Sequence, residues 1–147
     1  RPHFCSIGCA VCYSCSVFLK ILRIEMNGKQ KEFLAKSGIN LTDGLIYFSE
    51  NERLYEKYLF RFLEEPTFPE LFKAIEEDRR EDARRAAHSL KGITATLGFT
   101  SLNTPVKAQE FDFKNGRWEE GNQYTDELKK EYARIISVLR AAKALEN

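Results

Sequence analysis

Apolar residues recur at intervals of three and four along most of the chain beyond residue 28, which is the pattern of amphipathic helices. The clearest stripe consists of Ala83, Ala87, Leu90, Thr94 and Leu97. We predict that this helix begins near Asp82 and ends at Gly98, because glycine readily takes the left-handed conformation that closes many helices. No segment alternates convincingly between apolar and polar residues, so the pattern predicts an all-α protein.

The part of the chain before this stripe predicts shorter helices. Two of them, over residues 29–36 and 41–48, are expected to cover one end of a bundle. Ser49 and Glu52 have the spacing of a capping box, and Pro66 stops the helix that they open. The apolar side of that helix consists of Leu54, Tyr55, Tyr58, Leu59, Phe62 and Leu63. A second capping box at residues 67–70 predicts another helix, which runs into the charged stretch 76–82.

The part of the chain after the stripe predicts two longer helices. Thr100 or Ser101 opens the first, Pro105 bends its first full turn, and the pair Asn115-Gly116 ends it. The second begins near Trp118. Its apolar stripe consists of Leu128, Tyr132, Ile135, Leu139, Ala142 and Leu145. Long amphipathic helices with short connections favour an antiparallel up-down four-helix bundle, here with short additional N-terminal helices.

His88 lies roughly 140° from the centre of the apolar stripe of its helix, so we expect it to face water. Lys91 and Gly92 follow it by three and four residues and therefore share its face. An imidazole in water is largely neutral at pH 7 and has a free ring nitrogen that can attack an electrophile. The pattern thus indicates an exposed nucleophile beside a cation and a position without a side chain.

The run His88-Ser89-Leu90-Lys91-Gly92, followed by Leu97-Gly98, resembles the signature of the histidine-containing phosphotransfer (HPt) domain of bacterial multi-step phosphorelays. The resemblance extends over residues 37–145. It implies that His88 accepts a phosphoryl group from the aspartate of one receiver domain and passes it to the aspartate of another. The receiver would supply the carboxylates and the Mg²⁺, so we expect no cofactor on this chain.

The resemblance also implies roles for the neighbours of His88. Lys91 would neutralise phosphoryl oxygens, and Gly92 would let the active-site loop of the partner approach. A polar side chain on the next helix would hold the inner ring nitrogen. Glu110, which follows His88 by 22 residues, or Gln109, if the register differs by one, would supply that side chain.

Further residues on the same helical face are candidates for docking a partner. Arg84 and Arg85 would attract an acidic receiver surface, and Ala95 extends the face by two turns from His88. Lys107 on the next helix could also reach the site.

Composition narrows the function further. The chain of 147 residues suffices for one core, and its net charge of +1 includes no basic stripe for nucleic acid. It contains no Gly-rich ATP-binding loop, so we expect a phosphoryl carrier and not a kinase. The expected partners are response-regulator receiver domains and a hybrid histidine kinase, and the expected state is a cytoplasmic monomer without membrane contact. The alternative is an adaptor that is not phosphorylated and docks a partner through the same face.

The N-terminal segment differs from the rest of the chain. Residues 4–19 carry no charge and contain all four cysteines, at positions 5, 9, 12 and 15. This spacing occurs in the cluster-binding loop of radical S-adenosylmethionine enzymes, and such thiolates, with His3, could hold zinc or an iron–sulfur cluster. No barrel of strands and helices follows, and the run is shorter than the ~20 residues that span a bilayer. We therefore expect no metal, a working protein that starts near Met26, and two parts: residues 1–26 and an HPt-like domain over residues 27–147.

Overall fold

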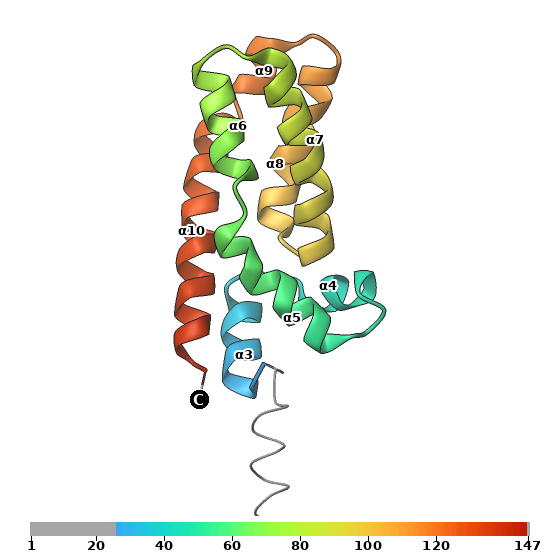
Figure 1. Cartoon of the computed structure of the whole chain (residues 1–147), viewed down its shortest axis with the longest axis vertical. Coiled ribbons are helices and arrows are strands. Elements are labelled where there is room, and N and C mark those ends of the chain that lie inside the picture. Colours follow the sequence, from blue (N-terminus) through green and yellow to red (C-terminus); the bar gives the residue numbers. More distant parts are fainter. Residues whose placement is uncertain (1–25, 147) are drawn as a thin grey trace, which may run out of the picture.

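The computed structural model describes residues 26–146, and this part of the chain contains helices and no strand (Figure 1). The predicted all-α class is therefore confirmed. The helices are α3 (Gly28–Lys36), α4 (Leu41–Tyr47), α5 (Glu52–Arg61), the 3₁₀ turn η1 (Phe62–Glu64), α6 (Thr67–Glu76), α7 (Arg80–Leu97), α8 (Thr100–Lys114), α9 (Trp118–Asn122) and α10 (Thr125–Ala144).

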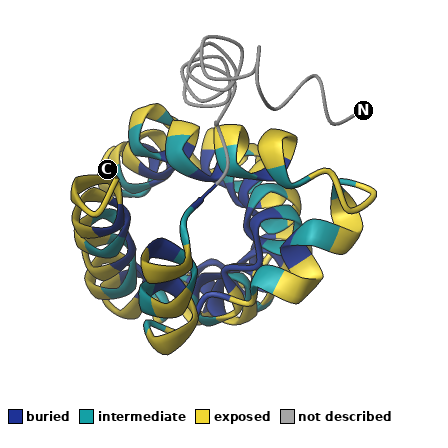
Figure 2. Cartoon of the chain, turned by 90° about the horizontal axis from the view of Figure 1, so that it is seen from below, coloured by how far each residue is buried: buried dark blue, intermediate teal, exposed yellow. Residues whose placement is uncertain are grey.

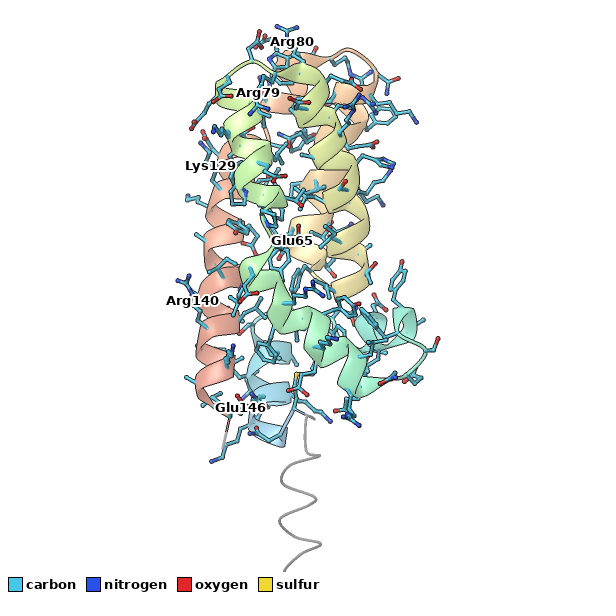
Figure 3. All side chains as sticks on the ribbon, viewed as in Figure 1. Glu65, Arg79, Arg80, Lys129, Arg140 and Glu146 are labelled. Atoms are coloured by element: carbon cyan, nitrogen blue, oxygen red, sulfur yellow. The ribbon has the colours of Figure 1, made fainter. Side chains whose placement is uncertain are left out.

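The longer helices form a bundle around one apolar core. Helix α7 packs against α6 and α8, and α10 packs against the same two helices. Buried residues face the interior of the bundle and exposed residues face outward, as Figure 2 shows from one end. Charged side chains such as Arg79, Lys129 and Arg140 project from the outer surface (Figure 3). No helix within residues 26–146 is both long and apolar enough to cross a lipid bilayer.

Helix α3 closes the end of the bundle where α10 finishes. Its first turn is a capping box, in which the side chains of Asn27 and Gln30 each accept a hydrogen bond from the other residue's backbone N–H. The same two side chains also donate to α10, Asn27 to the carbonyl of Leu145 and Gln30 to that of Ala142. Leu145 is the C-cap of α10, and the carbonyl of Ala142 also accepts from the backbone N–H of Leu145 at 3.1 Å. Met26, which we placed in the N-terminal segment, is 5% exposed and belongs to the core.

Helices α4 and α5 are fixed to the C-terminal end of α7. The phenol of Tyr55 is buried and donates to the carbonyl of Leu97 at 2.8 Å, and burial raises the pKa of this phenol. Gly44 lies against the Tyr55 ring, where any Cβ would overlap it. Gly98, with φ of 78°, ends α7 as predicted and accepts from the backbone N–H of Asn40. This end of the His88 helix is therefore held by two short helices.

Both predicted capping boxes in the first half are wrong. Ser49 and Glu50 have positive φ angles of 53° and 62°, so the chain turns sharply there, and Asn51 caps α5 instead. Its side chain accepts from the N–H of Leu54. The hydroxyl of Thr67 bonds to Glu65 and leaves the start of α6 without a side-chain cap. Local sequence spacing could not show these turns, because tertiary packing sets the backbone angles.

Three other expectations also need correction. The predicted last helix is two helices, α9 and α10, with a break at residues 123–124. Leu145 is 36% exposed and lies outside the core. Leu54 and Tyr58, expected on the buried side of α5, are 39% and 40% exposed. The apolar stripe of α5 is thus wider than the strip of core that the helix covers.

Candidate functional site

His88 projects into solvent from the middle of α7. The residues of the predicted stripe on this helix, Ala83, Ala87, Leu90, Thr94 and Leu97, are all buried. The side chain of His88 is 65% exposed, as its position on the helical wheel predicts. The core therefore fixes the rotation of α7 and thereby turns the imidazole outward.

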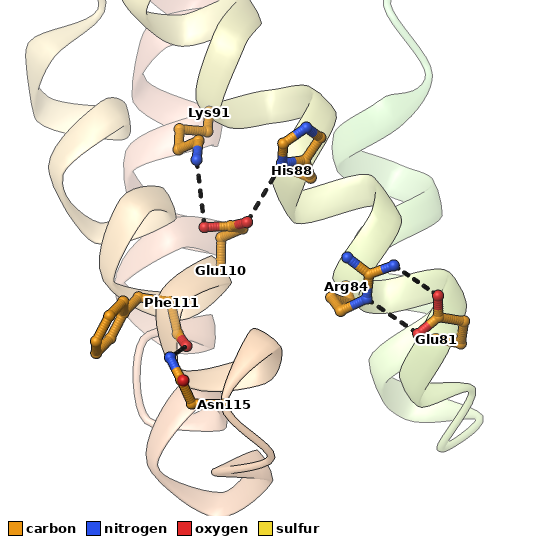
Figure 4. A network of polar contacts seen from close by, with 7 residues as sticks. All are labelled: Glu81, Arg84, His88, Lys91, Glu110, Phe111 and Asn115. Carbon is orange, nitrogen blue, oxygen red and sulfur yellow. Dashed lines mark hydrogen bonds and ion pairs between the residues drawn. The ribbon is translucent and has the colours of Figure 1, made fainter.

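Helix α8 places one carboxylate between two groups of α7. Glu110 Oε1 lies 3.3 Å from Nδ1 of His88, and Oε2 lies 3.4 Å from Nζ of Lys91 (Figure 4). The Glu110 side chain is only 7% exposed, so the carboxylate is largely shielded from water. The second ring nitrogen of His88 lies on the side away from Glu110 in Figure 4. The site thus combines an oriented imidazole with an outward-facing nitrogen.

Electrostatics keep this carboxylate ionised. Burial by itself raises the pKa of the Glu110 carboxyl, but the hydrogen bond with His88 and the charge of Lys91 outweigh it, so that the pKa lies below its ordinary value. Glu110 therefore carries a negative charge at neutral pH. In the tautomer with hydrogen on Nδ1, that nitrogen donates to Glu110 and the lone pair lies on Nε2.

Asn103 joins α8 to α7 close to the site. Its side-chain amide donates to the carbonyl of Lys91 at 3.0 Å and to the hydroxyl of Thr94 at 3.1 Å. Asn103 precedes Glu110 by seven residues, so both lie on the same face of α8. Asn103 was not among the predicted site residues, although a polar residue two turns before Glu110 was a usable signal. This contact fixes the position of α8 along α7 at the turn that carries Lys91.

The structure brings Glu110, and not Gln109, to the imidazole. Gln109 is fully buried on another side of α8. Its amide donates to the carbonyl of Gly121 at 3.0 Å and to the hydroxyl of Thr125 at 3.1 Å. These bonds hold the junction between α9 and α10, so Gln109 contributes to the packing of the bundle.

The space beside His88 is open at Gly92. This residue is exposed, and a Cβ built on it would meet no heavy atom within 4 Å. Glycine is therefore not needed here for the fold of this chain, and its effect is to lower the surface one turn beyond His88.

The predicted docking residues differ in how free their charges are. Arg84 and Arg85 both pair with Glu81, with N–O distances of 2.6 and 3.4 Å. The two positive charges therefore share one carboxylate on α7 itself. Lys107 is exposed and no hydrogen bond or ion pair of the described residues involves it, while Ala95 is half-buried. The two arginines thus present less free charge than their sequence positions indicate.

Within residues 26–146, no group of three or more His, Cys, Asp or Glu side chains is arranged to hold a metal ion. The four cysteines and His3 lie outside the described residues, so the prediction made for them stays a prediction.

The described residues form a helical bundle that presents an exposed histidine beside a buried carboxylate. A family model described as "Hpt domain" matches residues 61–138, more than half of the chain, and the chain belongs to this family. Hpt domains act in two-component phosphorelays, as phosphocarriers rather than kinases, and interact with response-regulator and kinase components. No curated protein and no solved structure matches the chain.

Proposed function

We propose that this protein carries a phosphoryl group on His88 between the aspartates of receiver domains in a phosphorelay. The observation that supports it most is the pairing of an imidazole that is 65% exposed with a carboxylate that is 7% exposed. Such a pair orients the ring while it leaves Nε2 open to a partner. The helices α6, α7, α8 and α10, taken as an antiparallel up-down bundle, are the rigid support of this arrangement.

Phosphoryl transfer at this site requires a short sequence of bond changes. The lone pair of Nε2 attacks the phosphorus of an aspartyl phosphate on the partner. The N–P bond forms while the bond from phosphorus to the carboxylate oxygen breaks, and the aspartate leaves with that electron pair. The Nδ1 proton stays on the ring and is held by Glu110. In the second transfer, the carboxylate of another receiver attacks the phosphorus, the N–P bond breaks, and the imidazole recovers its lone pair.

Two neighbours support this chemistry. The ammonium of Lys91 is half-exposed and lies one turn from His88, so it can neutralise phosphoryl oxygens when the group arrives. The open surface at Gly92 admits the partner's loop. The receiver domain would hold Mg²⁺ with its own carboxylates. The partners of this protein would be a response regulator and a hybrid kinase, and we expect the reaction to take place in the cytoplasm. A monomer presents the whole site.

Phosphorylation of His88 is tested with a labelled small phosphoramidate and with a phosphorylated receiver domain. The chain has two histidines, so His3→Gln is the matched control for His88→Gln. We expect acid-labile, base-stable label on the wild type and on His3→Gln, and at least a hundredfold less on His88→Gln. No label on folded wild-type protein from either donor would favour the docking adaptor instead. Label retained by His88→Gln would show that another residue accepts the phosphoryl group.

A further inference from the structure

One polar residue interrupts the apolar stripe of α7. Thr94 is fully buried, whereas the other members of the stripe are alanines and leucines. Its hydroxyl donates to the carbonyl of Leu90 at 2.7 Å and accepts from the side-chain amide of Asn103 at 3.1 Å. Buried polar groups lower stability unless they are hydrogen-bonded, so both of these bonds support the fold. Thr94 and Asn103 thus form a polar pair between α7 and α8.

The pair is satisfied in one alignment of the two helices. The amide of Asn103 finds two acceptors on α7, the hydroxyl of Thr94 and the carbonyl of Lys91 at 3.0 Å. Both acceptors lie within one turn of α7. A slip of α8 along α7 by one turn, about 5.4 Å, would separate the amide from both. Apolar side chains pack in several alignments, whereas a polar pair of this kind selects a single register.

The backbone of α8 holds this part of the helix weakly. Phe99, at the start of α8, provides no side-chain cap. Pro105 lies inside the helix and has no N–H, so the carbonyl of Ser101 receives no helical hydrogen bond from residue 105. Asn103 lies between these two interruptions. Its bonds to α7 therefore fix a turn that the hydrogen bonds of α8 itself leave incompletely held.

Glu110 depends on the same register. It follows Asn103 by seven residues, which is two turns on the same face of α8. Its oxygens lie 3.3 Å from Nδ1 of His88 and 3.4 Å from Nζ of Lys91 (Figure 4). Both distances are at the long end of the range for hydrogen bonds, so a small further displacement of α8 would break these contacts. Lys91 takes part in both sets, with its carbonyl to Asn103 and its ammonium to Glu110.

We propose that Asn103 and Thr94 are positioning residues of the phosphotransfer site, which set the register at which Glu110 meets His88. This inference rests on the proposed function. Neither side chain touches the phosphoryl group, and both act through Glu110. The rate at which His88 is phosphorylated should therefore depend on the pair only while Glu110 is present.

The test is a double-mutant cycle between Asn103 and Glu110, in which the rate of labelling by phosphoramidate is measured. Asn103 is half-buried, so we expect Asn103→Ala to fold and to slow labelling about fivefold. The same substitution introduced into Glu110→Gln should slow labelling by less than about twofold further. Asn115→Ala is the matched control, because Asn115 also donates its amide to a carbonyl, that of Phe111 at the end of α8. It should leave the rate unchanged.

Two substitutions of Thr94 separate the hydroxyl from the shape of the side chain. Thr94→Val keeps the shape and loses the hydroxyl, and we expect it to slow labelling about threefold. Thr94→Ser keeps the hydroxyl and should label at nearly the wild-type rate. The ¹⁵N chemical shifts of the His88 ring give a measurement that does not depend on transfer. In Asn103→Ala the tautomer with hydrogen on Nδ1 should be less populated than in the wild type, and in Asn115→Ala it should not change.

Other results would overturn the proposal. Wild-type labelling by Asn103→Ala, or equal slowing with and without the Glu110 carboxylate, would show that the pair does not act through Glu110. Slowing by Thr94→Ser as large as that by Thr94→Val would assign the effect to packing. If Asn103→Ala does not fold, Thr94→Val takes its place in the cycle. If phosphoramidate labels no folded form, the proposed function fails, and the ¹⁵N shifts of His88 still decide whether the pair positions Glu110.

Discussion

At the scale of single residues, the main feature is that one carboxylate contacts two groups of α7. Glu110 contacts the His88 ring through one oxygen and Lys91 through the other. The sequence predicted a polar partner 22 residues beyond His88 but left residues 109 and 110 both open. A shift of one residue rotates a helix position by about 100°, and Pro105 made the register of α8 uncertain. The structure resolves this because Gln109 bonds to Gly121 and Thr125 in the core.

Replacement of this carboxylate by an amide should slow phosphorylation without unfolding the protein. In Glu110→Gln we expect labelling by phosphoramidate to fall about tenfold, which corresponds to roughly 1.4 kcal/mol for a weakened charge-assisted hydrogen bond. Glu131→Gln is the control, because Glu131 forms an ion pair with Arg134 on α10 and is not part of the site. Equal rates for wild type and Glu110→Gln would show that the carboxylate does not orient the ring.

The same carboxylate links stability to pH. Its pKa lies below the ordinary value of 4.5 in the folded protein, so the stabilisation is fully present above that value. It is lost as the pH falls through the folded pKa. Comparison of the unfolding free energies of wild type and Glu110→Gln should therefore show a difference at pH 7 that shrinks in acid. The measurement is denaturant unfolding at pH 7 and again below pH 4.

At the scale of elements, the end of α7 shows what sequence can and cannot predict. Glycine at position 98 predicted a left-handed cap, and the structure has φ of 78° there. The approach of another segment was not predictable from helical periodicity. A Cβ on Gly98 would lie 2.1 Å from the carbonyl oxygen of Asn40, which comes from a distant part of the chain. The glycine therefore serves both the cap and the docking of the N-terminal helices.

The two effects can be separated by comparing two glycines with similar angles. Gly98→Ala combines left-handed strain with the clash and should cost about 3 kcal/mol, or about 10 °C in Tm. Gly116 has φ of 74° and open space around its Cβ position, so Gly116→Ala should cost only about 1 kcal/mol. Thermal unfolding measures both. Equal losses would mean that the close approach of Asn40 adds nothing to the cost of the substitution.

At the scale of the whole molecule, the sequence predicted an all-α protein but not how its first helices dock. Helical periodicity reports which face of each helix is apolar and contains no information about which neighbour covers it. The hydrogen bonds from Asn27 and Gln30 to α10 join positions more than 110 residues apart. The exposed apolar residues of α5 were not predicted for the same reason. The apolar stripe of this helix is wider than the part of the core that it covers.

The closure of the bundle by α3 should contribute measurably to stability. Gln30 is 2% exposed, and its loss leaves the carbonyl of Ala142 without this donor. We expect Gln30→Ala to lower the free energy of unfolding by about 2 kcal/mol. Gln123→Ala, at an exposed position with no side-chain hydrogen bond among the described contacts, should change it by less than 0.5 kcal/mol. Denaturant unfolding distinguishes the two, and similar values would show that α3 does not brace α10.

The hydrogen bond between Asn27 and Leu145 also has an architectural consequence. It brings the start and the end of the described helical unit to the same spot on the surface. A unit of this kind can be inserted into a surface loop of a larger protein, because its two ends lie close together and the loop needs little rearrangement. The contact that closes one end of this bundle thus also makes the helical unit suitable for insertion into another protein.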